Sequence, residues 1–152
     1  MIDRFEELLR ELSVQLDTTL HLDKIGACSL KIDEQFHVQI ECDPHQERVL
    51  IATFICELPP GKFRENILKD ALKANHPFPQ NGTLAYSDRN NQLALFSYLP
   101  FTNLTGRKLS EFLNAFVEKT GQWRSAVDAG QTSGLTSSTT NPEGGSIFDI
   151  KQ

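Results

Sequence analysis

Histidine, cysteine and carboxylate side chains are the residues of this chain that could carry out chemistry, and their spacing indicates no site. Cys42 and His45 form a single Cys-x-x-His pair, and nothing else in the sequence completes it. A zinc site takes four protein ligands, or three and an open position. Asp33 and Glu34 are adjacent carboxylates in a predicted turn, where a solvated bend is the usual outcome. These residues therefore predict no metal site.

Motifs that bind phosphate or activate a nucleophile are also missing from the sequence. The nine glycines form neither Gly-x-x-x-x-Gly-Lys nor Gly-x-Gly-x-x-Gly, and there is no Gly-x-Ser-x-Gly elbow. A triad that distant residues assemble in space would leave no such motif. The sequence accordingly predicts a protein that is not an enzyme and that binds no cofactor.

The composition excludes several classes of partner. A formal net charge of −5 and a pI near 5.3 argue against binding to nucleic acid or to anionic lipid. No apolar run approaches the roughly 20 residues of a membrane-spanning helix, and the acidic start of the chain is unlike a signal peptide. Three cysteines, an odd number, are typical of unpaired, buried thiols in a reducing compartment. We expect a cytoplasmic protein.

Hydrophobic periodicity predicts the elements that would position any site. The first helix carries apolar residues at three- and four-residue steps and ends near Asp17. Strands are predicted from alternation or from short apolar runs bounded by turns. In chain order, the predicted ranges are a helix over 2–17, strands over 28–32, 36–42 and 49–58, a helix over 59–75, strands over 83–87 and 92–99, and a helix from Asn103 or Thr105. The order α-β-β-β-α-β-β-α predicts the α+β class.

The composition changes at Asp128, and this predicts a domain over 1–127 and a flexible Gly/Ser/Thr-rich tail over 128–152. Such a segment has too few apolar residues to offset the entropy of ordering. Its end contains a short apolar patch, Ile147-Phe148-Asp149-Ile150. Two interpretations of this patch stay open: a solvated terminus, or a segment that docks on the domain and competes with a partner.

The predicted elements carry more apolar surface than one layer of packing needs. Leu93, Leu95 and Leu99 point away from Phe96 and Tyr98, so the last strand is apolar on both faces. The third strand is also doubly apolar, and the apolar residues of the second helix span about half of its circumference. Either helices of this chain cover both faces of the sheet, or a second polypeptide covers one of them.

The chain resembles the class I type III secretion chaperones of the Tir chaperone (CesT-like) family over about residues 1–127. The likeness lies in the order of the elements and in a strand that ends in Leu-Pro before a helix with Phe-Val and a late Trp. The residues that carry it are Leu93-Ala-Leu-Phe-Ser-Tyr-Leu-Pro100, Leu109, Phe112-Leu113, Phe116-Val117 and Trp123-Arg124. Gly121 departs from the pattern, because glycine in a helix interior costs about 1 kcal/mol.

This resemblance implies a bacterial chaperone with a mostly antiparallel five-stranded sheet packed by helices. Such chaperones bind the N-terminal region of a secreted effector or gatekeeper protein and keep it stable and competent for export. They are dimers, either homodimers or heterodimers with a paralogue, and the dimer contact runs through the second helix. The implied dimer residues are Phe63, Ile67, Leu68, Ala71 and Leu72. The implied client-binding residues are Leu9, Val14, Phe36, Val38, Val49, Ile51, Phe54 and Phe96.

Two alternatives differ in class from a secretion chaperone. One is a small α+β ligand-binding or catalytic domain, which would need a pocket with convergent polar groups such as His37, Glu41 and His45. The other is a dimeric adaptor without an export function. The sequence does not separate the adaptor from the chaperone, and it leaves open which face of the sheet forms the client groove.

Overall fold

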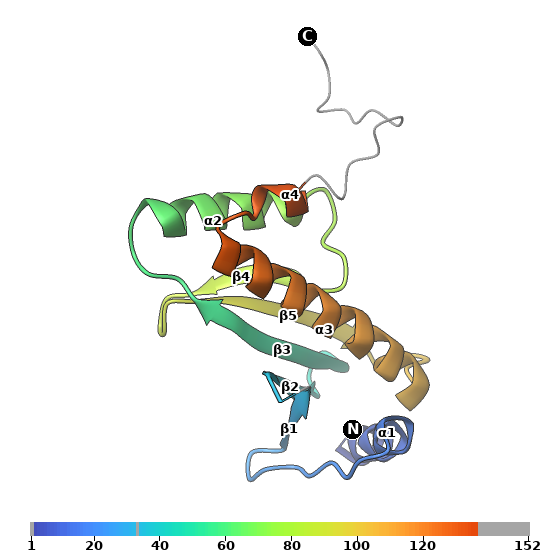
Figure 1. Cartoon of the computed structure of the whole chain (residues 1–152). Coiled ribbons are helices and arrows are strands. Elements are labelled where there is room, and N and C mark those ends of the chain that lie inside the picture. The colour runs from blue at the N-terminus through green and yellow to red at the C-terminus, as the bar shows by residue number, and fades with distance from the viewer. Residues whose placement is uncertain (1, 33, 137–152) are drawn as a thin grey trace.

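The computed structural model describes residues 2–32 and 34–136 (Figure 1). The predicted order of three helices and five strands is confirmed, and one short helix follows it. The elements are α1 (Ile2–Leu16), β1 (Ala27–Ile32), β2 (Phe36–Asp43), β3 (Arg48–Glu57), α2 (Lys62–Ala74), β4 (Thr83–Ser87), β5 (Gln92–Pro100), α3 (Gly106–Ala129) and α4 (Ser133–Thr136).

The five strands form one sheet in the order β1-β2-β3-β5-β4, and every neighbouring pair is antiparallel. The predicted hairpins are present, with Glu34 and Asn91 in the left-handed conformation that tight turns require. β3 lies in the middle of the sheet, as its doubly apolar sequence predicts. β1 and β4 are the two edges.

The core lies on one face of the sheet, which we call the inner face. Residues paired across the sheet share a face, and the pairs Ile40–Ile51 and Thr53–Leu95 consist of buried residues. Buried side chains of α1, α2 and α3 belong to the same cluster. Figure 1 shows α3 running across the sheet, with α1 beside its first turns and α2 near its last turns. The three helices therefore cover the inner face.

The contact between α1 and α3 is close because of Gly106. A Cβ at this position would lie 2.5 Å from Glu11 Cβ and 2.6 Å from the Glu11 carbonyl carbon. The same glutamate accepts a hydrogen bond from the Gly106 N–H at 2.8 Å, and Thr105 caps the helix by accepting from the Lys108 N–H. The Arg4 guanidinium donates to the Leu104 carbonyl at 3.0 Å. Together these bonds fix the start of α3 against α1.

The boundary predicted at residue 128 falls inside a folded region. α3 continues through Gly121 to Ala129 and ends at Gly130, whose φ of 69° is the usual helix stop. Thr132 is buried and donates to Asp70 Oδ2 on α2 at 2.6 Å, and Leu135 packs against the core. The folded part therefore extends to at least Thr136, and the predicted docking patch 147–150 lies outside the described residues.

Candidate functional site

The second face of the sheet carries apolar side chains that no described helix covers, and we call it the outer face. The register pairs Leu50 with Tyr98, and Ala52 with Phe96. A third pair, Phe54 and Ala94, continues the same face. We define the outer face by these six residues.

Aromatic side chains dominate the outer face. Phe54 is 52% exposed and Tyr98 is 40% exposed. The Phe96 and Tyr98 rings meet edge to face with centroids 6.0 Å apart. The Arg48 guanidinium lies 3.6 Å from the Tyr98 ring centroid and is paired with Asp43 at 3.0 Å. An apolar area with a charged and aromatic margin is the composition of a protein-binding surface.

A β-bulge ends the outer face at one side. The register between β3 and β5 shifts between Phe54 and Cys56, so that Cys56 pairs with Leu93, a residue of the inner face. Cys56 therefore does not share a face with Leu50 and Phe54, as strict alternation predicts. Burial raises the pKa of the Cys56 thiol, and the nearby Asp128 carboxylate on α3 adds to the shift.

The structure divides the predicted client-binding residues between core and surface. Phe54 and Phe96 come together on the outer face, and Val14 is 74% exposed on α1. The others have buried side chains, which corrects the expectation that they lie on the surface; these are Leu9, Phe36, Val38, Val49 and Ile51. Their alternation has the same period as that of the exposed set, and only the position of the helices separates the two.

The predicted dimer residues are divided in the same way. Ile67 and Ala71 are buried beneath α2, so they support the helix and do not form its surface. Phe63 is exposed, Leu68 is partly buried, and Leu72 is 69% exposed.

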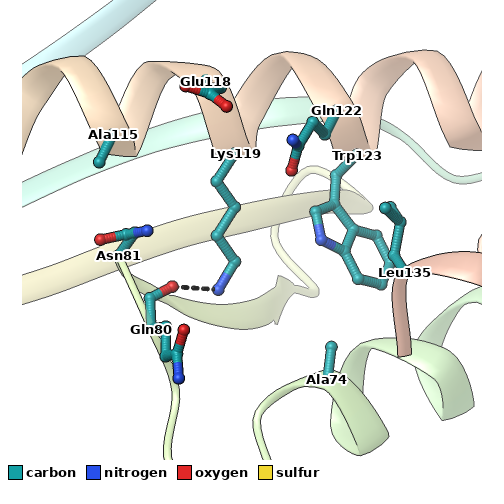
Figure 2. A pocket seen from close by; sticks show the side chains of 9 residues that line it. All are labelled: Ala74, Gln80, Asn81, Ala115, Glu118, Lys119, Gln122, Trp123 and Leu135. Atoms are coloured by element: carbon teal, nitrogen blue, oxygen red, sulfur yellow. Dashed lines mark hydrogen bonds between the residues drawn. The ribbon is translucent and has the colours of Figure 1, made fainter. Parts of the chain in front are cut away.

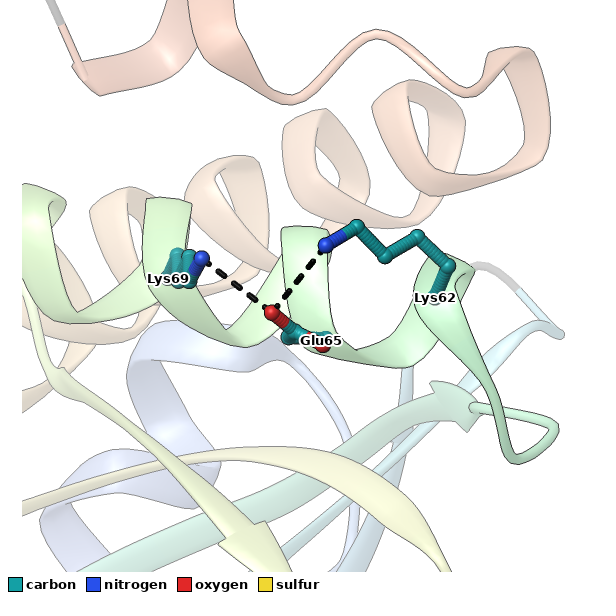
Figure 3. A network of polar contacts seen from close by, with 3 residues as sticks. All are labelled: Lys62, Glu65 and Lys69. Carbon is teal, nitrogen blue, oxygen red and sulfur yellow. Dashed lines mark hydrogen bonds and ion pairs between the residues drawn. The ribbon is translucent and has the colours of Figure 1, made fainter.

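An ion network lies on the same exposed side of α2 as Leu72, seven residues earlier along the helix (Figure 3). Glu65 pairs with Lys62 at 3.3 Å and with Lys69 at 3.1 Å. Hydrogen bonds from Lys69 and Lys62 lower the pKa of Glu65. The outward side of α2 is thus an apolar stripe beside fixed surface charges.

A second apolar area lies where α1 leads into β1. A groove of about 360 Å³ runs between α1 and the following connection, and Leu9, Leu20 and Leu22 contribute its apolar lining. Ile25 is exposed nearby. In the described sheet, the outer edge of β1 is free except for one bridge between Leu22 and Cys28. A groove beside a free strand edge suits an extended polypeptide.

The structure offers little support for a catalytic or metal site. Within residues 2–32 and 34–136, no three histidine, cysteine or acidic residues cluster to hold a metal ion. His37 and His45 are exposed, and they line no enclosed pocket with Glu41. Among the described helices, none has the length and apolar character to cross a membrane.

Sequence reasoning missed several surface residues of these areas. Leu50 and Tyr98 belong to the outer face but are not among the predicted client residues. Their position along the strands, at two- and four-residue steps from Phe54 and Phe96, is the signal that would have found them. Ile25 lies in a connection without periodicity, and no sequence signal marks it.

Comparison with known proteins identifies a family and a fold. The model of the Tir chaperone protein (CesT) family matches residues 7–124 of the chain. A sequence search of curated proteins finds no match. Solved structures of similar fold are the HopA1–SchA chaperone–effector complex, the Yersinia pestis type III secretion chaperone SycH with a fragment of YscM2, and the ExsC–ExsE complex.

The fold match extends over most of the chain. The chain similar in the HopA1–SchA complex has a TM-score of 0.69 at 22% identity, and the match covers 82% of this chain and 96% of that one. For SycH the values are 0.63, 20%, 76% and 96%. For the ExsC–ExsE complex they are 0.69, 19%, 84% and 96%.

Proposed function

We infer the function of this chain from its family: it belongs to the Tir chaperone protein (CesT) family and is a type III secretion chaperone for a secreted polypeptide. The chain binds the N-terminal region of an effector or gatekeeper protein and keeps it stable and competent for export. The observation that carries this inference within the molecule is the outer face, an exposed apolar surface on a member of a chaperone family.

The proposed client contacts are narrower than the sequence predicts. Phe54 and Phe96 on the outer face, and Val14 beside the α1 groove, are the predicted residues whose side chains a client can reach. Leu9 contributes through the wall of the groove. Phe36, Val38, Val49 and Ile51 lie in the core, and for a client to use them α1 or α3 would have to leave the sheet. We therefore leave these four out of the proposed site.

We assign self-association to the outward side of α2. Leu72 and Leu68 would pack against the same helix of a second copy, with Phe63 at the margin. A contact of a surface with its own copy satisfies two-fold symmetry, which most dimers have. A paralogous chaperone in place of the second copy remains the alternative partner.

The test is to identify the client and then remove one side chain of the outer face. The tagged chain is purified from its native bacterium, the bound protein is identified, and its secretion is compared between the wild type and a deletion strain. Loss of secretion without loss of synthesis supports the export function. A partner that is secreted equally well without the chain would instead favour the adaptor.

A matched pair of variants then tests the surface. Phe54→Asp should weaken binding of the identified client by about tenfold or more, because it places a charge in an apolar contact. Phe78→Asp is the control, since Phe78 is 76% exposed in the loop between α2 and β4, away from the outer face. Equal client binding by both variants, measured by titration calorimetry, would contradict the assignment of the outer face.

A further inference from the structure

A polar cavity lies on the other side of the molecule from the outer face, where α3 meets the connection between α2 and β4. Its volume is about 190 Å³. Figure 2 shows the side chains around it, which include Lys119, Gln122 and Trp123 of α3, Asn81 of the connection and Leu135 of α4. Two nitrogen groups in this cavity are not matched by the acceptors around them.

The first of these groups is the ammonium of Lys119. It is half-buried, and Nζ donates to the Gln80 carbonyl at 2.6 Å and to the Gly82 carbonyl at 2.8 Å. An ammonium has three N–H donors, so these two bonds leave one. No carboxylate lies within 4.0 Å of Nζ among the described residues, and burial lowers the pKa of this lysine. The charge is therefore partly desolvated and has no counter-ion.

The second group is the indole N–H of Trp123. The side chain is 2% exposed, and its nitrogen has no hydrogen-bond acceptor among residues 2–32 and 34–136. In the same part of the chain, no fully enclosed side-chain nitrogen or oxygen lacks a partner, so the indole nitrogen must open to the cavity. Figure 2 shows this nitrogen on the side of the ring that faces Lys119. Two donors, one of them charged, thus face the same space.

We propose that this cavity binds a carboxylate group, with Lys119 supplying the charge and the indole N–H of Trp123 supplying a second hydrogen bond. A carboxylate has two oxygens, each of which accepts hydrogen bonds, and it would neutralise the ammonium. The side-chain amide of Gln122 lies at the rim and can donate as well. The cavity has the volume of several water molecules, each taking about 30 Å³, which accommodates a carboxylate on a short aliphatic stem.

The single tryptophan of the chain gives a direct readout. The full chain is titrated with N-acetylglutamate at constant ionic strength while Trp123 fluorescence is recorded, and N-acetylglutamine is the uncharged probe of the same shape. We expect a saturable change with N-acetylglutamate and at least about tenfold weaker binding of N-acetylglutamine, since a charge-assisted hydrogen bond is lost. Equal responses to the two probes would overturn the proposal.

Variants of Lys119 separate this site from a general effect of anions. Lys119→Met should weaken binding of N-acetylglutamate by about tenfold, whereas Lys108→Met, an exposed lysine of the same helix, should leave it unchanged. Lys119→Arg keeps the charge and should retain binding, and it serves as the test if the methionine variant does not fold. Unchanged binding by Lys119→Met, or loss of binding by Lys119→Arg while that variant is folded, would contradict the site.

Two sources of the carboxylate are distinguished in the full chain. Leu135 lines the cavity one residue before the described part ends, and the sequence beyond it contains Glu143 and Asp149. If these residues supply the carboxylate, the double variant Glu143→Gln and Asp149→Asn should bind N-acetylglutamate more tightly than the wild type, because a competitor is removed. Unchanged affinity of a probe that still depends on Lys119 would assign the carboxylate to another polypeptide.

Discussion

The inner and outer faces of the sheet have similar apolar sequences but different environments. On the inner face, Val49, Ile51, Leu93 and Leu95 are fully buried beneath the helices. On the outer face, Phe54 and Tyr98 of the same two strands are substantially exposed. The difference teaches that apolar alternation alone does not define a core. The inner face holds the fold together, and the outer face is available for a partner.

Truncating an inner-face residue should have the largest effect on stability. Leu95→Ala removes a fully buried side chain beneath Gly82 and α3, and we expect a loss of about 3 kcal/mol in the free energy of unfolding. Phe54→Ala on the outer face should cost less than about 1 kcal/mol, because the ring is half exposed in the folded chain. Urea unfolding followed by circular dichroism measures both. Equal losses would show that the outer face is covered in solution.

A methyl group at Gly106 should have the next largest effect. Gly106→Ala places Cβ within 2.6 Å of two Glu11 atoms, so α1 and α3 must separate. We expect a loss of about 1–3 kcal/mol in the free energy of unfolding, as for an overpacked core. Thermal and urea unfolding would reveal it. A variant as stable as the wild type would mean that α1 adjusts without cost.

The same substitution at Gly121 should act in the opposite direction. Gly121 lies within α3, and its added Cβ would meet only Phe36 Cζ, at 3.8 Å. Gly121→Ala should therefore stabilise the chain by about 0.5–1 kcal/mol through helix propensity. Comparison of the unfolding midpoints of the two alanine variants checks the prediction. Destabilisation by Gly121→Ala would indicate a close contact at this position in the assembled protein.

The smallest effect on folding is expected on the outward side of α2, although its effect on assembly should be large. Leu72→Glu should change the free energy of unfolding of the monomer by about 0.5 kcal/mol or less. It should nevertheless prevent self-association, since it would bury a charge in an apolar contact. Light scattering with size-exclusion chromatography reports the mass. Val14→Glu is the matched control, an equally exposed aliphatic residue on α1. A dimeric Leu72→Glu variant would exclude this side of α2 as the interface.

The sequence by itself determined the elements and their order, because these depend on local periodicity and on turn and capping residues. The alternation of β2, the Asp88–Asn91 turn and the Thr105 cap are all recognisable without the fold. The end of the folded region was less accessible. Thr132 and Leu135 are held by α2 and by the core, and their own segment is polar and without periodicity.

Only the tertiary structure decided which apolar face is the core. Phe54 and Ile51 are equally apolar and both lie in β3, and the position of α1, α2 and α3 on one side buries Ile51 and leaves Phe54 exposed. The same holds for Ile67 and Leu72 on α2. The bulge at Phe54 and Cys56, the approach of Gly106 to Glu11 and the pairing of Trp123 with Lys119 around one cavity also depend on residues far apart in the chain. Local periodicity carries no information about such contacts, because long-range packing alone sets them.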